Sequence, residues 1–217
     1  MRSVAPVVDP ATQPAQTAKV VNVANALTLL RILLVPIFVV LLFADGGHSP
    51  GWRVCAFATF VVATVTDFID GDLARSRGLV TDVGKVADPI ADKALTGAAL
   101  IGLSVLGDLA WWVTVVILVR EVGVTALRFF VIRHGVIPAS RGGKAKTLVQ
   151  NLAIGLYLLP LTGWAASVRF WLMGVAVVVT VATGGDYVAR AVHLRRTSAR
   201  AEMKRARRLA ASSTDTK

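Results

Sequence analysis

Four aspartates, Asp67, Asp70, Asp88 and Asp92, are spaced so that their carboxylates can act together. The first two are three positions apart and the last two are four apart, so each pair shares one face of a helix. Both surrounding segments are mainly apolar, and a carboxylate within a membrane helix costs about 2.5 to 3.5 kcal/mol. This cost predicts that the aspartates have a function and that they bind a positively charged partner.

Divalent metal ions are the partner that best suits these carboxylates. Four carboxylates at close range cannot all stay ionised without compensating positive charge. Arg75 and Lys93 are too few to supply it, and Lys93 points about 100° away from Asp92 on an ideal helix. The cluster contains no His or Cys, which favours Mg²⁺ or Mn²⁺ over zinc. We expect two ions, because several carboxylates suit a two-metal clamp on a phosphoryl group.

Membrane helices are the elements that must position the aspartates. Of the 217 residues, 55% are hydrophobic and 17% are charged, whereas about a quarter of a soluble domain is charged. A helix needs about 20 mainly apolar residues to cross a bilayer. The sequence therefore predicts an all-α integral membrane protein with six transmembrane helices, at about 24–43, 52–75, 86–106, 110–133, 147–165 and 169–193. The short connection 76–85 makes the second and third helices antiparallel neighbours, which brings the four aspartates together.

The distribution of Lys and Arg predicts the orientation, because positively charged loops stay in the cytoplasm. These residues concentrate in the second and fourth connections and in the C-terminal tail, so both termini and the aspartates are expected on the cytoplasmic side. We expect a disordered extension over 1–19, a membrane domain over 20–194 and a basic cytoplasmic tail over 195–217. The tail is interpreted as a helix on anionic lipid rather than a nucleic-acid-binding segment.

The aspartate segment closely resembles the signature of the CDP-alcohol phosphotransferase family. Eight fixed positions over 26 residues match without a departure: Asp67, Asp70, Gly71, Ala74, Arg75, Gly84, Asp88 and Asp92. A separate segment, with Asn25, Thr28 and Arg31, resembles the first-helix pattern Asn-x-Leu-Thr-x-x-Arg of that family. Single features have simpler interpretations: Asp67 alone suits a solvated helix end, Asn25 and Thr28 suit helix caps, and small residues suit helix packing.

The resemblance implies an enzyme that moves a phosphatidyl or similar group from a CDP-linked donor to an alcohol and releases CMP. It implies that Asp67, Asp70 and Asp88 are metal ligands and that Asp92 is both a metal ligand and the general base. The residues expected to contact the CDP donor are Asn25, Thr28, Arg31, Gly71, Ala74, Arg75 and Thr81. A homodimer in a lipid membrane is expected by resemblance only.

Basic residues outside the signature predict a phosphorylated acceptor, since guanidinium and ammonium groups bind phosphate. They are Arg120, Arg128, Arg141, Lys144 and Lys146. A simpler interpretation of Arg120 is that it snorkels or pairs with acidic neighbours. The segments Arg120-Glu121 and 143–147 resemble the phosphatidylglycerophosphate synthase branch, which implies CDP-diacylglycerol as donor and glycerol 3-phosphate as acceptor.

Three alternatives remain open at this point. A synthase that uses inositol phosphate would also need a basic acceptor pocket. An ion transporter could use intramembrane carboxylates, but it should place them near the membrane midplane with broken helices. A structural protein that binds anionic lipid would explain the basic tail but not the four aspartates.

Overall fold

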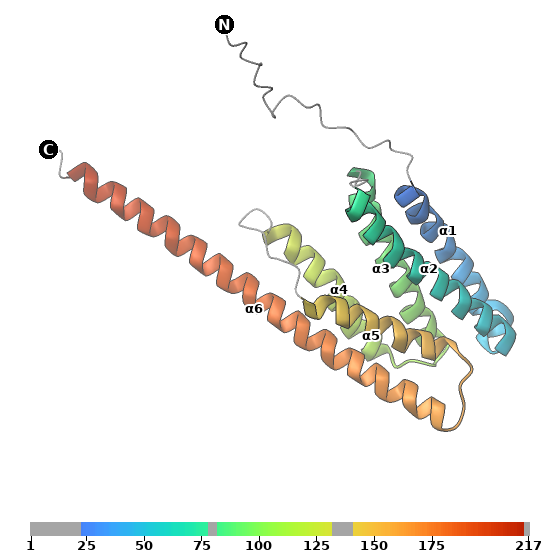
Figure 1. Ribbon diagram of the computed structural model, residues 1–217. Coiled ribbons are helices and arrows are strands. Elements are labelled where there is room, and N and C mark those ends of the chain that lie inside the picture. Colours follow the sequence, from blue (N-terminus) through green and yellow to red (C-terminus); the bar gives the residue numbers. More distant parts are fainter. Residues whose placement is uncertain (1–22, 78–81, 132–140, 215–217) are drawn as a thin grey trace, which may run out of the picture.

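The computed structural model describes the backbone of residues 23–77, 82–131 and 141–214, and side chains within 26–68, 90–127 and 145–193. These ranges contain six α-helices and no strand (Figure 1). In chain order the elements are α1 (Val23–Phe43), the short 3-10 helix η2 (Ala44–Gly47), α2 (Pro50–Arg77), α3 (Asp82–Val105), α4 (Trp111–Val131), α5 (Arg141–Leu158) and α6 (Trp164–Thr214). The predicted all-α class is confirmed. The 1–19 extension lies outside the described residues.

Helices α1 to α4 begin and end within about four residues of the predicted segments. The prediction of 147–165 for the fifth helix is wrong, because α5 begins at Arg141 and ends at Leu158. Its first residues, 141–146, are small or charged, so hydropathy alone places them in a connection. Its end precedes Pro160, which lacks the backbone N–H that a continuing helix needs. Helix α6 begins at Trp164 and continues without a break to Thr214.

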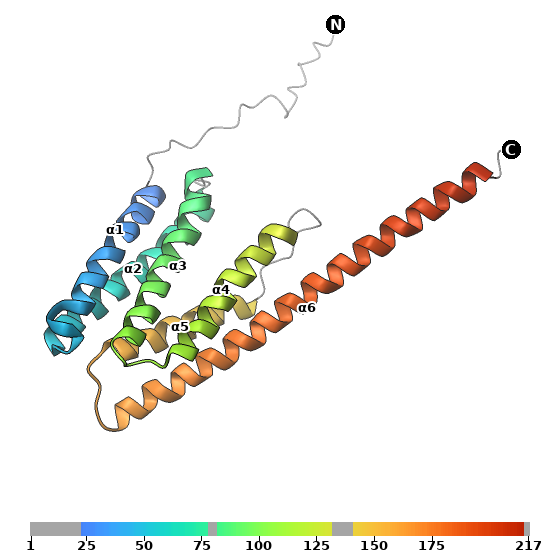
Figure 2. The same ribbon diagram turned by 180° about the vertical axis from the view of Figure 1, so that it is seen from behind.

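One apolar core joins all six helices. Helix α1 packs on α2 and α3, whereas α6 packs on α4 and α5, and α5 also reaches α2 and α3. Figure 2 shows the same two groups from behind, with α1, α2 and α3 on one side and α6 on the other. The core includes Phe38, Leu42, Phe60, Leu100, Ile117, Ile154 and Met173, each 2% exposed or less. Burial of these side chains is the main force that holds the helices together.

Small residues allow α1 and α3 to approach closely. A Cβ atom at Gly102 would lie 2.5 Å from Cδ2 of Leu42, which is itself fully buried. The missing side chain therefore sets the distance between these two helices.

Arg53 joins four segments at the end of the bundle opposite the aspartates. Its Nη1 lies 2.6 Å from Asp108 Oδ2, in the link between α3 and α4. The same guanidinium donates to the carbonyl oxygens of Tyr157 (3.0 Å) and Leu158 (3.2 Å) at the end of α5, and of Gly47 (3.4 Å) in η2. Terminal helix carbonyls lack partners within their own helix. Arg53 satisfies them and so stabilises this end of the bundle.

The outer surface of the bundle is that of a membrane protein. Large apolar side chains are exposed around it, including Val40 (69%), Val119 (66%) and Val178 (68%). Among the described residues, three helical segments are long and apolar enough to cross a membrane: Ala26–Gly47, Pro50–Phe68 and Trp164–His193. Helix α6 has 51 residues and is therefore roughly 75 Å long, more than twice the hydrocarbon thickness. Its C-terminal part projects past the other helices (Figure 1).

Candidate active site

A partly buried ion pair joins α1 and α2 at the first of the four aspartates. Arg31 Nη1 lies 2.6 Å from Asp67 Oδ1, and the Arg31 side chain is fully buried while that of Asp67 is 33% exposed. Thr28, one turn before Arg31, is also buried at 4% exposure. Two of the three first-helix residues expected to contact the donor, Thr28 and Arg31, therefore face the bundle interior, next to a predicted metal ligand.

Asp92 lies on α3 at the wall of a cavity between α3, α4 and α5. The residues that line this cavity are Asp92, Lys93, Thr96, Leu118, Glu121, Lys146, Thr147 and Gln150. Asp67 and Arg31 lie within electrostatic range of the Asp92 carboxylate. Two of the four predicted metal ligands, Asp67 and Asp92, thus interact electrostatically although they come from different helices.

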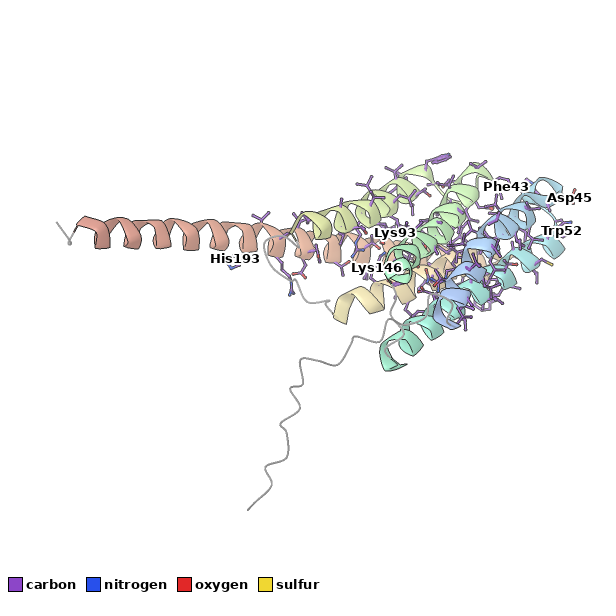
Figure 3. The ribbon with its side chains drawn as sticks, turned by 90° about the horizontal axis from the view of Figure 1, so that it is seen from above. Phe43, Asp45, Trp52, Lys93, Lys146 and His193 are labelled. Atoms are coloured by element: carbon purple, nitrogen blue, oxygen red, sulfur yellow. The ribbon has the colours of Figure 1, made fainter. Side chains whose placement is uncertain are left out.

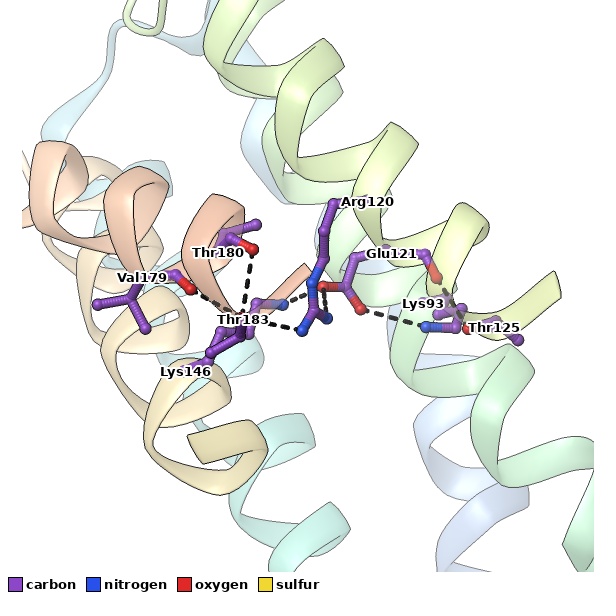
Figure 4. Close-up of polar contacts among 8 residues, drawn as sticks. All are labelled: Lys93, Arg120, Glu121, Thr125, Lys146, Val179, Thr180 and Thr183. Carbon is purple, nitrogen blue, oxygen red and sulfur yellow. Dashed lines mark hydrogen bonds and ion pairs between the residues drawn. The ribbon is translucent and has the colours of Figure 1, made fainter. Parts of the chain in front are cut away.

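Glu121 is the centre of a cluster of basic side chains. Its Oε2 accepts a hydrogen bond from Lys93 Nζ of α3 at 3.2 Å, and its Oε1 accepts hydrogen bonds from Lys146 Nζ of α5 and from Arg120 Nη1 at 3.1 Å. Figure 4 shows these contacts converging on one carboxylate. The cluster connects α3, α4 and α5 by side chains.

Arg120 extends the cluster to α6. Its Nη2 donates to Thr183 Oγ1 at 3.1 Å. A Cβ atom at Gly184 would lie 3.0 Å from Arg120 Cγ, so the glycine leaves room for the arginine stem. Arg120 lies behind Glu121 and is not among the described residues that line the cavity. Its contacts match the simpler of the two interpretations, in which it pairs with an acidic neighbour.

Lys146 is the predicted acceptor residue that the structure places beside Asp92. Its side chain is only 3% exposed, and it lines the same cavity. Viewed from above, Lys146 and Lys93 lie together inside the bundle, whereas Phe43, Asp45 and Trp52 lie at its far margin (Figure 3). A buried ammonium requires a charged or polar partner. Glu121 is that partner in this structure, and its negative charge holds Lys146 at the cavity.

The remaining predicted residues lie outside the described side chains. Thr81 lies in a stretch that is not described at all. The others occupy helices whose side chains are not described at these positions: Asn25, Asp70, Gly71, Ala74, Arg75, Asp88, Arg128, Arg141 and Lys144. Their roles stay predictions. The helix bounds do place Arg141 and Lys144 in the first turn of α5, rather than in the connection where they were expected.

Comparison with known proteins identifies the family. The family model of CDP-alcohol phosphatidyltransferases matches residues 21–182. The chain belongs to this family. It is 57% identical over 180 residues to a protein of Mycobacterium tuberculosis named "Probable phosphatidylglycerophosphate synthase", an alignment that covers 83% of this chain and 86% of the relative.

More distant relatives carry a name of the same kind. A Bacillus subtilis protein named CDP-diacylglycerol–glycerol-3-phosphate 3-phosphatidyltransferase is 39% identical over 186 residues, covering 78% of this chain and 94% of the relative. A Rickettsia bellii protein with the same name is 35% identical over 171 residues, covering 76% of this chain and 93% of the relative. The family resemblance inferred from the aspartate signature is therefore confirmed.

The residues of this family member fit a hard divalent cation. Asp67 and Asp92 supply carboxylate oxygens, the ligands that Mg²⁺ and Mn²⁺ prefer. Asp67 and Asp92 repel each other electrostatically, and Lys93 and Arg31 offset only part of the negative charge around Asp92. Within the described side chains no group of three or more His, Cys, Asp or Glu is gathered for a metal, but Asp70 and Asp88 fall outside those side chains. The donor chemistry therefore agrees with the predicted ions.

Sequence reasoning missed two residues of the cavity as functional candidates, Glu121 and Gln150. Glu121 left a signal, because an acidic residue within an apolar helix requires a partner just as the aspartates do. On an ideal helix Lys93 points about 100° away from Asp92, yet both residues border the same cavity. Gln150 left no local signal, since a single glutamine in a helix has no characteristic spacing. Only the packing of α5 against α3 places it there.

Proposed function

We propose that this protein transfers the phosphatidyl group of CDP-diacylglycerol to glycerol 3-phosphate, giving phosphatidylglycerol phosphate and CMP. Membership of the CDP-alcohol phosphatidyltransferase family and the names of its relatives support the reaction class and both substrates. The observation that carries the choice of a phosphorylated acceptor is the buried Lys146, which lines one cavity with Asp92. A lysine held in such a place suits a phosphate on the acceptor.

In the proposed reaction Asp92 is the general base. Its carboxylate accepts the proton of the acceptor hydroxyl, and the hydroxyl oxygen forms a bond with the phosphorus that carries diacylglycerol. The bond between that phosphorus and the bridging oxygen of CMP breaks, and CMP leaves with the electron pair. Proton, nucleophile and leaving group are then all accounted for without a covalent enzyme intermediate.

We further propose that Asp67, Asp70, Asp88 and Asp92 hold two Mg²⁺ or Mn²⁺ ions. Bound ions would neutralise charge on the donor pyrophosphate and on the departing CMP. Arg31 orients Asp67 through their partly buried ion pair, which supports a defined position for this ligand. By resemblance, Asn25, Thr28, Arg31, Gly71, Ala74, Arg75 and Thr81 contact the CDP donor.

The acceptor phosphate is proposed to bind Lys146 together with Arg128, Arg141 and Lys144. Arg120 instead holds Glu121 in place, because its own contacts run to Glu121 and Thr183. Glu121 holds Lys93 of α3 and Lys146 of α5 at the cavity in the absence of substrate. A preformed basic cluster requires less reorganisation when the phosphate binds.

For the whole chain we propose six membrane spans, both termini in the cytoplasm, and an active site at the cytoplasmic face of the cell membrane. The excess of Lys and Arg in the second and fourth connections and in the tail supports this orientation. The membrane domain covers 20–194, between the extension 1–19 and the basic tail 195–217. A homodimer is proposed by resemblance to the family.

The test is CMP release by purified protein in detergent with CDP-diacylglycerol and Mg²⁺ or Mn²⁺. Glycerol 3-phosphate is compared with inositol 1-phosphate and with inositol. We expect release with glycerol 3-phosphate alone. Release only with an inositol compound would keep the aspartate chemistry and overturn the acceptor, and the absence of CMP with every acceptor would refute the proposed reaction.

A further inference from the structure

Gln150 is a buried glutamine that lines the cavity beside Asp92. It lies on α5, one turn after Lys146, and is 2% exposed. Both residues line the cavity, as does Asp92 from α3. Within the described part of the chain, Gln150 Oε1 has no hydrogen-bond partner. Most buried polar atoms in proteins have such a partner, so an unpartnered amide oxygen on a residue that lines a cavity is a candidate acceptor for a donor from outside the chain.

The neighbouring side chains specify what that donor must be. The two ammonium groups at the cavity, of Lys93 and Lys146, both donate to Glu121. The carboxylates of Asp92 and Glu121 line the cavity together with these two lysines, so the formal charges of the lining cancel and a neutral hydroxyl can enter without an electrostatic penalty. The cavity has a volume of about 20 Å³, which is room for one group the size of a water molecule, so only a single hydroxyl of a larger ligand can enter it. A hydroxyl group fits this size, this charge environment and the acceptor character of Oε1.

We propose that Gln150 accepts a hydrogen bond from the hydroxyl of the acceptor alcohol that does not react. This inference rests on the proposed function, in which glycerol 3-phosphate is the acceptor. That molecule carries a phosphate and two hydroxyls, one of which attacks the donor beside Asp92. With its phosphate at Lys146, the remaining hydroxyl is on the carbon next to the phosphorylated one.

The spacing on α5 suits this pair of groups. Lys146 and Gln150 are four residues apart, so their side chains leave the same helix face about 5 to 6 Å from each other. The phosphate and the middle hydroxyl of the acceptor can therefore bind neighbouring positions of one helix, while Asp92 acts from α3. Gln150 is then a specificity-determining residue: it selects acceptors that carry a hydroxyl beside the phosphate-bearing carbon.

The experiment compares two acceptors that differ only in that hydroxyl, glycerol 3-phosphate and 3-hydroxypropyl phosphate. CMP release gives kcat/KM for each acceptor with the unmodified protein and with Gln150→Met. The Met side chain is about as long as that of Gln but has no amide. In the unmodified protein, kcat/KM should be about tenfold or more higher with glycerol 3-phosphate than with 3-hydroxypropyl phosphate. Gln150→Met should reduce that preference to about twofold or less, by losing activity with glycerol 3-phosphate while retaining it with 3-hydroxypropyl phosphate.

Thr180→Val is the matched control. Thr180 is fully buried on α6, and its Oγ1 likewise has no partner among the described residues, but it does not line the cavity. The Thr180→Val variant should show the same acceptor preference as the unmodified protein. If Gln150→Met aggregates on size exclusion, Gln150→Asn withdraws the amide by one carbon and must show the same loss of preference.

Two results would overturn the role of Gln150 while the proposed function stands. One is equal activity of the unmodified protein with both acceptors. The other is an unchanged preference in Gln150→Met or Gln150→Asn, including an equal loss of activity with both acceptors, which would indicate a structural role. Failure of the unmodified protein to release CMP with either acceptor would instead refute the proposed function and the inference together.

Discussion

Replacing Lys146 with Met tests the acceptor site most directly. Met keeps the apolar stem of this buried side chain and removes its charge. If Lys146 binds the phosphate of glycerol 3-phosphate, the variant loses one charge-assisted hydrogen bond, about 1.5 to 3 kcal/mol. The KM for glycerol 3-phosphate should then rise about 10- to 150-fold, since each 1.4 kcal/mol corresponds to a factor of ten. The KM for CDP-diacylglycerol should change about twofold or less.

The contact with Glu121 requires a second variant, because Lys146→Met also leaves that carboxylate with only its contacts to Lys93 and Arg120. The double variant Lys146→Met/Glu121→Gln removes the excess negative charge. If Lys146 serves only to neutralise Glu121, the double variant should recover the original KM. If Lys146 binds phosphate, the KM for glycerol 3-phosphate should stay raised about tenfold or more.

The assay is CMP release at saturating CDP-diacylglycerol with varied glycerol 3-phosphate, and the reverse titration. Arg190→Met is the control for loss of a positive charge, because Arg190 is 56% exposed on α6 and pairs only locally with Asp186 among the described contacts. An unchanged KM for glycerol 3-phosphate in Lys146→Met would refute the acceptor site. A larger effect on the KM for the CDP donor would also refute it and assign Lys146 to the donor instead.

Three further predictions concern the base, the metal ions and the stability of the fold. Asp92→Asn should lower turnover at least about 100-fold while CDP-diacylglycerol still binds, as measured by CMP release and by donor binding; near-original turnover would exclude Asp92 as base. Chelation with EDTA should abolish CMP release, and added Mg²⁺ or Mn²⁺ should restore it; full activity in excess chelator would contradict the metal assignment. Arg53→Met should lower the free energy of unfolding by about 2 to 4 kcal/mol, because Asp108 and the helix-end carbonyls lose their partner. The unfolding midpoint in detergent checks this, and a midpoint equal to that of Arg190→Met would show that the Arg53 contacts contribute nothing.

The helices and the family were both predictable from the chain alone. Runs of apolar residues predicted six helices and the bounds of α1 to α4 to within about four residues, because hydrophobic length is a local property of the sequence. The fifth helix was misplaced where its polar first turn disagreed with hydropathy. The aspartate signature was equally local, since spacings of three and four residues place carboxylates on one helix face wherever the helix packs.

Side chains that meet from different helices were not predictable in this way. Lys93, Glu121 and Lys146 are separated by 28 and 25 positions in the chain, yet one carboxylate contacts both lysines. Gln150 has no local sequence signal, and only the packing of the helices places it at the cavity that Asp92 also lines. Nothing in the local pattern specifies how far α3, α4 and α5 are rotated about their axes.

By itself the sequence determined the helical elements, the membrane setting, the carboxylate pairs and the family. The tertiary structure alone determines that Glu121 contacts basic residues of three helices, that Arg120 contacts both Glu121 and Thr183, and that Gln150 lines the cavity. The physical reason is that periodicity fixes which residues share a face within one helix. Which faces meet depends instead on the packing of the whole core, where contacts such as that of Gly102 with Leu42 set the distances between helices.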